Sequence, residues 1–413
     1  MCLLALLCVA TYARTLAIPL FEDDYPNITD ARKYGPPSGL PLLIQDAWPF
    51  PRTTSYWLTY GLWDTFGLRP AVFHGASLVV HVINTFLLFW LCRAWTPFKE
   101  AAFWPAAFFA VSEGHQEAVI WYSSVVELLM FMFGVASLIC WRRALERKRQ
   151  DAWAAGSFIL FCGALLSKES AVVFLPLFWL ATPLAAWRPS LRWLLRHGAA
   201  GLVMALFITS TRGQSFRFSD GSFSLHAPVW ITWPNSYGRL LWIWGVVAGA
   251  WLFWRAGRVM QRSALPALIW IGIALLPYSF LTYMHRIPSR QVYLASAGLA
   301  MLVGLAMTHV VGTMESRRWV VAALIALVAL HNIGYIWTRK HEQFLERAAP
   351  TEQLISLARR TDGPIWVQCF PRPRIVAEEA VRLATGRPPE TLLWNDARQP
   401  PAEPAPRFCY VGP

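Results

Sequence analysis

Apolar and polar residues alternate in long blocks along the chain, and about eleven blocks are predominantly apolar. A helix needs roughly 20 apolar residues to cross a bilayer, and most blocks approach that length. We therefore expect about eleven transmembrane helices, near residues 2–20, 71–92, 101–112, 121–141, 153–167, 170–187, 192–210, 237–254, 264–282, 291–311 and 319–338. The first block has no basic segment before it and no clear cleavage site after it, which favours a retained span over a signal peptide.

The remaining segments follow other patterns. In the loop at 21–70, "PRTTSYWLTYGLWDTFGLRP" has apolar residues at helical spacing, which predicts an interfacial helix. Near the C-terminus, "GPIWVQCF" and "RFCYVG" predict two strands, and "IVAEEAVRLATG" predicts a helix that Gly386 ends. The fold class is thus an all-α polytopic membrane domain, 1–338, with a small extracytoplasmic αβ module, 339–413. The module is too small for a large core of its own, so we expect it to lean on the membrane domain.

Composition and charge placement agree with this interpretation. The chain is 56% hydrophobic and 15% charged, against about 25% charged in soluble domains. Its net charge of +13 lies largely in alternate loops between apolar blocks, and such loops face the cytoplasm. We therefore expect a multi-pass membrane protein with a cytoplasmic N-terminus and an extracytoplasmic tail. The membrane we expect is the bacterial inner membrane. No basic stripe carries interleaved stacking aromatics, which argues against a nucleic-acid partner.

Three consecutive acids, Glu22, Asp23 and Asp24, follow the first span. A carboxylate at a membrane boundary can act as a general base, bind a divalent cation, or simply be solvated. Adjacent like charges raise one another's pKa, which favours a functional role over a solvated loop. We expect Asp23 or Asp24 to be catalytic with Glu22 beside them. If the reaction needs Mg²⁺ or Mn²⁺, Asp23 and Asp24 are its expected ligands.

Two further motifs combine acids with His or Lys. "SEGHQEAVIW" places His115 and Glu117 close together, too compactly for a metalloprotease helix. Glu127 lies inside the next span, where a lone acid is costly and needs a partner such as His115, Arg52 or Lys168. "LSKES" holds Lys168 and Glu169, which form either a phosphate contact or a self-paired turn.

Two more groups lie in segments expected to face outward. "HRIPSRQVYLASAG" places His285, Arg286 and Arg290 at the mouth of the tenth span. Arginine suits forked contacts with phosphate oxygens, although an interfacial arginine can also snorkel. Cys369 and Cys409 lie in the two predicted strands and would share an oxidising compartment, so they form either a disulfide or two separate buried thiols.

Several motifs resemble the C superfamily of glycosyltransferases, most closely the membrane region of the TPR-containing O-mannosyltransferases and their bacterial relatives. They are "FEDDYPNI", "PRTTSYWLTYGLWDTFGLRPAVFHGASLVVHVINTFLLF", "GHQEAVIWYSSVVELL", "LLSKESAVVFLP" and "SRQVYLASAG", in this order over roughly residues 1–350. The matching positions include Arg52, Pro70, His74, His81, Asn84, His115, Glu117, Trp121 and Glu127. The chain departs from the pattern at Ser112-Glu113, where relatives often have His-Pro, at Val125, where they have Arg, and in lacking TPR repeats after residue 350.

The resemblance implies transfer of a sugar from a polyprenyl-phosphate-linked donor to a protein or glycan acceptor at the extracytoplasmic face. A carboxylate base would invert the anomeric centre. Arg290 and Lys168 are the expected phosphate contacts, with Arg52 and Arg286 as weaker candidates, and His115, Glu117, Glu127, Glu169 and His285 as supporting polar residues. The alternatives are a transporter or lipid flippase, which tends to show repeated halves, and a non-catalytic assembly or sensor protein.

Overall fold

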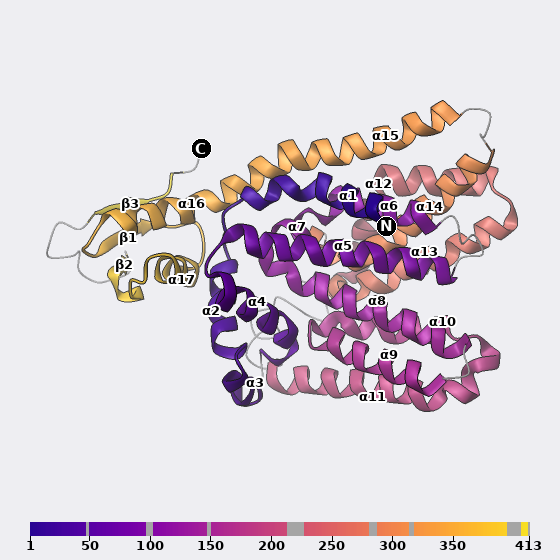
Figure 1. The fold of residues 1–413 in the computed structure, drawn as a ribbon, viewed down its shortest axis with the longest axis horizontal. Coiled ribbons are helices and arrows are strands. Elements are labelled where there is room, and N and C mark those ends of the chain that lie inside the picture. The colour runs from indigo at the N-terminus through magenta and orange to yellow at the C-terminus, as the bar shows by residue number, and fades with distance from the viewer. Residues whose placement is uncertain are drawn as a thin grey trace.

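Long helices run side by side through most of the molecule (Figure 1). This computed structural model describes residues 1–46, 49–95, 102–146, 150–212, 227–280, 287–313, 318–394 and 406–411. Its α-helices are α1 (Cys2–Tyr12), α2 (Asp24–Tyr34), α3 (Leu40–Asp46), α4 (Thr53–Phe66), α5 (Pro70–Trp95), α6 (Phe103–Val111), α7 (Gln116–Ile120), α8 (Val125–Glu146), α9 (Gln150–Leu165), α10 (Phe174–Ala181), α11 (Trp187–Arg212), α12 (Val229–Arg255), α13 (Arg258–Leu275), α14 (Tyr293–Thr313), α15 (Arg318–Tyr335), α16 (His341–Arg360) and α17 (Arg374–Thr385). The strands are β1 (Ile365–Cys369), β2 (Leu392–Trp394) and β3 (Arg407–Cys409).

Six helical stretches within the described residues are long and apolar enough to cross a membrane: Pro70–Ala94, Tyr122–Glu146, Leu184–Ser210, Arg258–Phe280, Ser289–Thr313 and Trp319–Arg360. Two shorter apolar stretches are Cys2–Ala17 and Glu169–Ala181. The chain is thus a multi-pass membrane protein, but the expected count of eleven spans is not confirmed. Helix α6 has only 9 residues and so rises about 14 Å, less than half of the hydrocarbon core. Helix α12 is broken at Trp242, where φ is 36° and ψ is −147°.

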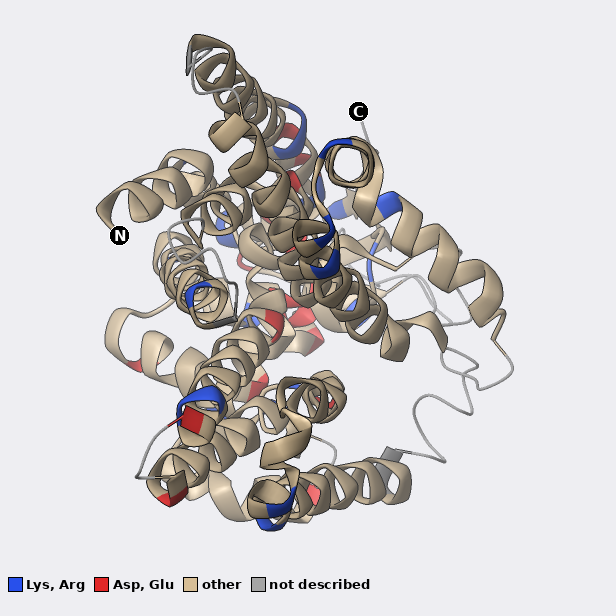
Figure 2. Ribbon diagram, turned by 90° about the vertical axis from the view of Figure 1, so that its right-hand side faces the viewer, with Lys and Arg blue, Asp and Glu red and all other residues tan. Residues whose placement is uncertain are grey.

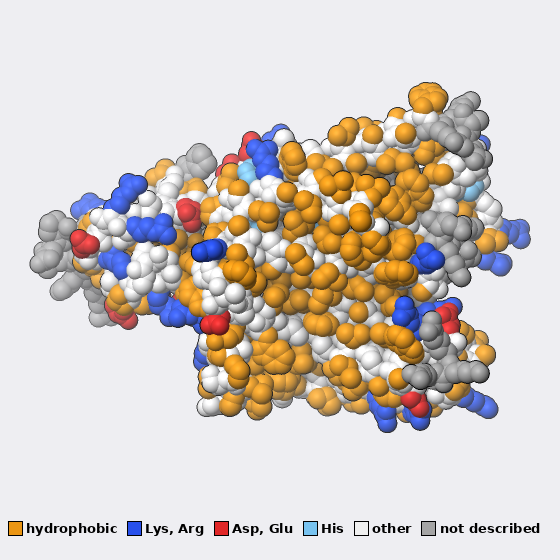
Figure 3. Space-filling model, viewed as in Figure 1, with side chains coloured by type: hydrophobic (Ala, Val, Ile, Leu, Met, Phe, Trp, Pro, Cys, Tyr) orange, Lys and Arg blue, Asp and Glu red, His pale blue; other side chains and the backbone are white. Residues whose placement is uncertain are grey.

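Apolar and charged side chains occupy different parts of the surface. In Figure 3 a broad apolar band covers the helices, and the charged side chains gather at its two ends. Most helices seen along the bundle in Figure 2 carry no charge over most of their length. Such a band is what a bilayer requires of the side chains that face it.

Helix α14 forms the centre of the bundle and packs against α6, α12 and α13. Small residues make this close packing achievable. A Cβ added at Gly304 would lie 2.3 Å from the ring of Pro105 on α6, and one at Gly298 would lie 2.6 Å from the Ala267 carbonyl oxygen on α13. The core of the membrane domain thus depends on glycines at these two positions.

The last part of the chain projects from one end of the bundle (Figure 1). Helix α15 continues through a π-helical turn, Ile336–Lys340, into α16, which leads to this part. We call α16, α17 and the three strands, residues 341–411, the C-terminal segment. Its parallel sheet has the order β2-β1-β3 and shares an apolar core with α16 and α17, which includes Leu354, Val367 and Val381.

The two strands and the helix predicted here are present, and Gly386 ends α17 in the left-handed conformation with φ of 77°. Strand β2 was not predicted, because three residues are too short to show a period of two.

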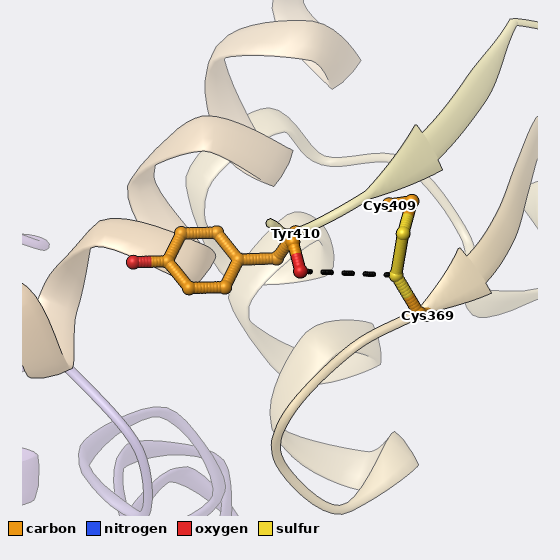
Figure 4. Close-up of a disulfide and its surroundings, with 3 residues drawn as sticks. All are labelled: Cys369, Cys409 and Tyr410. Atoms are coloured by element: carbon orange, nitrogen blue, oxygen red, sulfur yellow. Dashed lines mark hydrogen bonds between the residues drawn. A yellow bond between two sulfur atoms is a disulfide. The ribbon is translucent and has the colours of Figure 1, made fainter. Parts of the chain in front are cut away.

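Cys369 and Cys409 form a disulfide between β1 and β3 (Figure 4). The two residues are partners in the register of the parallel pair, and their Cα atoms are 4.5 Å apart. Cys369 Sγ lies 3.8 Å from the carbonyl oxygen of Tyr410, the residue that follows Cys409. The bridge therefore links the central strand of the sheet to the last described strand of the chain.

Removing this disulfide should destabilise the C-terminal segment. The bridge closes a loop with a sequence separation of 40, which corresponds to about 3–4 kcal/mol in the chain-entropy model. We expect the double variant Cys369→Ser/Cys409→Ser to show faster hydrogen exchange in β1 and β3. Cys2→Ser, at an exposed free cysteine, is the control and should change nothing there. Free thiols at both positions of the wild-type protein, alkylated from lysis onward, would contradict the bridge.

Candidate active site

The three acids lie where the chain leaves α1 and enters α2. A short 3-10 helix, Ala13–Ala17, follows α1, and an extended stretch leads to Glu22, Asp23 and the first residue of α2, Asp24. Phe21 anchors this turn, because its ring stacks on Trp121 at 6.2 Å and contacts Phe344 at 5.6 Å. The acids are thus held between the helix bundle and α16.

Asp24 is fully buried and accepts hydrogen bonds on both oxygens. Ser123 donates its backbone N–H and its hydroxyl to Oδ1 at 2.8 and 2.6 Å, and Phe21 donates its backbone N–H to Oδ2 at 3.1 Å. Burial raises the pKa of Asp24 to about 7, and these hydrogen bonds oppose the rise. Asp24 therefore ties the turn to the segment before α8 and has little access to a substrate.

Glu22 is buried and paired with two arginines. Arg347 Nε and Nη2 lie 3.0 and 2.5 Å from its two carboxylate oxygens, and Arg372 Nη2 lies 2.6 Å from Oε1. The backbone of Glu22 has φ of 51°, which lies in the left-handed region that residues other than glycine rarely adopt. Such a conformation persists only where the surroundings enforce it, and here the two ion pairs do so.

Asp23 differs from its neighbours because its side chain is exposed. Surrounding protein atoms raise its pKa by excluding water, and the charge of Glu22 raises it further. Arg290, Arg347 and Arg372 oppose this rise. Of the three acids, Asp23 therefore combines solvent access with a pKa shifted toward neutrality, which suits a general base.

Arg290 and Arg347 lie over the same aromatic ring. Their guanidinium carbons are 4.7 and 4.8 Å from the centroid of Trp121, as in cation–π pairs. Glu117 holds both segments, because it accepts the backbone N–H of Arg290 at 3.2 Å and lies 3.7 Å from Nη1 of Arg347. Among the described residues, the guanidinium of Arg290 makes no ion pair within 4 Å, so its charge remains available for an anion.

Two other expected phosphate contacts are already paired. Lys168, 7% exposed, forms an ion pair with Glu127, which also accepts a hydrogen bond from Tyr278 at 3.1 Å. Arg52 forms a two-pronged ion pair with Glu169. Each acid therefore neutralises a cation from another segment, and Lys168 is one of the partners expected for the buried Glu127.

Breaking the buried pair of Lys168 and Glu127 should affect stability more than donor binding. Removing one partner leaves an uncompensated buried charge, which costs about 3–5 kcal/mol. We expect Lys168→Met and Glu127→Gln each to lower the thermal stability in detergent, and the double variant to lose less than their sum. Unchanged stability of Lys168→Met with lost donor affinity would instead support a direct phosphate contact.

The expected supporting histidines have different outcomes. His115 is fully buried, its Nε2 lies 2.6 Å from Ser296 Oγ, and its ring packs against Phe109 at 4.3 Å. Burial lowers the pKa of His115, so it is neutral and links the loop to α14. His285 and Arg286 lie outside the described residues.

A recess of about 120 Å³ lies between α2, α4 and the start of α8. Arg52 and Ser123 line it together with Asn27, Ser55, Tyr56, Thr59, Tyr122, Val125 and Val126. The described part of the chain contains no group of three or more His, Cys, Asp or Glu residues that could hold a metal ion. Because both oxygens of Asp24 are occupied, the Mg²⁺ or Mn²⁺ option rests on Asp23 and remains a prediction.

Sequence reasoning missed Arg347 and Arg372. They are separated from Glu22 by more than 300 residues, and neither belongs to a motif shared with the resembled family. For Arg347 the available signal was the charged run "RKHEQFLERAAP", which follows directly on the last apolar block.

No family model and no curated protein matches the sequence. The fold is similar to that of ArnT from Cupriavidus metallidurans bound to undecaprenyl phosphate, with a TM-score of 0.56 and 10% sequence identity. The match covers 95% of this chain and 88% of the ArnT chain. The chain therefore shares the polytopic fold of ArnT. The closer resemblance to the O-mannosyltransferases is not tested by this match.

Proposed function

We propose that the protein is a membrane glycosyltransferase that moves a sugar from a polyprenyl-phosphate-linked donor to a hydroxyl acceptor. The observation that carries the proposal is the exposed carboxylate of Asp23 beside Arg290 and Arg347, at one end of an apolar helix bundle. The fold shared with ArnT, whose structure holds undecaprenyl phosphate, supports a lipid phosphate as the donor carrier.

Asp23 acts as the general base in this proposal. It takes the proton of the acceptor hydroxyl while that oxygen attacks the anomeric carbon. The bond from the anomeric carbon to the phosphate oxygen breaks, and its electron pair leaves with the polyprenyl phosphate. Arg290 stabilises the charge that develops on this leaving group. A single displacement inverts the anomeric centre.

We infer the side of the membrane from the distribution of charge. Helices α5 and α8 begin at the end of the bundle that carries α2, and Arg93, Arg142 and Arg143 lie near their opposite ends (Figure 1). By the positive-inside rule we infer that the basic end faces the cytoplasm, and we propose that Asp23 and the C-terminal segment lie at the extracytoplasmic face. A mannosyl donor and a protein or glycan acceptor stay predictions from the resemblance.

Transfer of a labelled sugar tests this proposal directly. Purified protein in detergent or nanodiscs is incubated with a polyprenyl-phosphate-linked hexose and a panel of protein and glycan acceptors. We expect labelled product and free polyprenyl phosphate in equal amounts. Movement of the lipid-linked sugar between leaflets of a vesicle, without transfer, would instead favour the flippase alternative.

The value of kcat/KM for sugar transfer should increase with pH over the acidic range. An acid with a raised pKa loses its proton progressively as the pH rises through that raised value, so the basic form of Asp23 accumulates as the pH increases. We expect kcat/KM to rise with pH through a midpoint above about 3.9, the ordinary value for Asp. A series of rate measurements from pH 4 to pH 8 checks this. A rate that falls over the same range would mean that a protonated acid is required.

A further inference from the structure

Besides the contacts of α16, the C-terminal segment reaches the acidic turn and α2 through Arg372 and α17. Arg372, which follows β1, reaches the buried carboxylate of Glu22 at 2.6 Å. Further along α2, Thr29 donates its hydroxyl to Glu379 of α17 at 2.6 Å and accepts a hydrogen bond from Arg382 at 2.9 Å. The segment therefore contacts both Glu22, the residue before Asp23, and the middle of α2, the helix that follows Asp23.

The first contact bears on a strained part of the backbone. Glu22 is the residue with φ of 51°, and its carboxylate is held by Arg347 on one side and Arg372 on the other. Because Asp23 is the next residue, the conformation of Glu22 sets the direction in which the exposed Asp23 carboxylate points. The chain restrains the backbone of Arg372 on both sides, because the disulfide-linked Cys369 lies three residues before it and α17 begins two residues after it.

We propose that Arg372 is a positioning residue for the transfer reaction. By pairing with Glu22 it keeps the acidic turn in its left-handed conformation and thereby orients Asp23 toward the acceptor hydroxyl. This inference rests on the proposed function. It gives the C-terminal segment a role in the reaction without making Arg372 a contact of the substrate.

The charges around Asp23 predict a change in the pH dependence of the rate that misfolding alone would not cause. The groups that face Asp23 are Glu22 beside it, Arg290 before α14, Arg347 on α16 and Arg372 after β1. Removing Arg372 takes away one positive charge that lowers the pKa of Asp23, so that pKa should rise further. The rising limb of the pH–rate profile should then move to higher pH.

The test compares Arg372→Ala, Arg372→Lys and the control Arg407→Ala in the full-length protein. Arg407 is an exposed arginine of the same sheet and stacks on Trp366 at 5.2 Å, away from the acidic turn. For Arg372→Ala we expect kcat to fall by up to about a hundredfold with little change in KM for the donor. We also expect a rising limb at higher pH and faster hydrogen exchange at residues 21–27. Arg372→Lys should restore much of the rate, and Arg407→Ala should match the wild type.

Two checks separate the possible failures. Retention of the Cys369–Cys409 disulfide in Arg372→Ala, seen by non-reducing mass spectrometry, shows that the segment is still folded. Wild-type kinetics and wild-type exchange at residues 21–27 in that variant would overturn the inference. Absence of transfer by the wild-type protein would overturn the proposed function, and the exchange measurement would then still decide whether Arg372 holds the turn.

Discussion

Replacement of Asp23 by Asn should nearly abolish sugar transfer while leaving the protein folded. The amide has the shape of the carboxylate but cannot accept the acceptor's proton, and a positioned base contributes about 10²–10⁴-fold to a rate. The side chain of Asp23 is exposed and makes no hydrogen bond within the described residues, so its replacement breaks no contact of the fold. Steady-state transfer and thermal unfolding of the same preparation measure the two expectations together.

Asp24→Asn is the matched comparison, because it places the same substitution one residue later. Asp24 accepts three donated hydrogen bonds, and an amide presents a donor where one of its acceptor oxygens was. We expect this variant to lose about 1–3 kcal/mol of stability, which the thermal unfolding curve reports. Wild-type turnover by Asp23→Asn would remove Asp23 from the mechanism. Selective loss of turnover in a stable Asp24→Asn would transfer the role of base to Asp24.

The sequence alone predicted the class of fold and the location of the acids. Long apolar blocks leave few options other than membrane helices, and an acidic run directly after such a block falls at a membrane boundary. The blocks at 101–112 and 170–187 nevertheless became the short helices α6 and α10. Hydropathy reports burial in any apolar surroundings, so it does not distinguish a helix that crosses the membrane from one that ends inside the protein.

The roles within the acidic run could not be predicted from the sequence. Glu22, Asp23 and Asp24 look equivalent there, and only the partners separate them: Arg347 and Arg372 hold the first, and Ser123 and Phe21 hold the third. Arg347, Arg372 and Ser123 come from distant parts of the chain, and no local pattern encodes contacts over such separations. The same reason explains Lys168, whose pairing with Glu127 depends on how α8 packs against the segment that follows α9.

Replacement of Arg290 should have the second large effect on sugar transfer. A leaving phosphate gains charge as its bond to the sugar breaks, and a positioned cation stabilises that charge most in the transition state. Arg290 is suited to this because Glu117 fixes its backbone and Trp121 supports its guanidinium, whereas no described carboxylate forms an ion pair with it. Lys168 and Arg52 lack this freedom, since each is committed to an acid.

Arg290→Ala should therefore lose donor affinity and turnover together, with kcat reduced by about 10²–10³-fold. Arg32→Ala is the matched control, since Arg32 also stacks on a tryptophan, Trp63, at 4.8 Å, but is exposed on α2. Affinity is measured from binding of polyprenyl phosphate alone, and turnover from labelled transfer at saturating donor. Arg290→Lys should recover part of both, because lysine keeps the charge and loses the planar fork that matches phosphate oxygens. Unchanged affinity for polyprenyl phosphate in Arg290→Ala would remove Arg290 from the donor site.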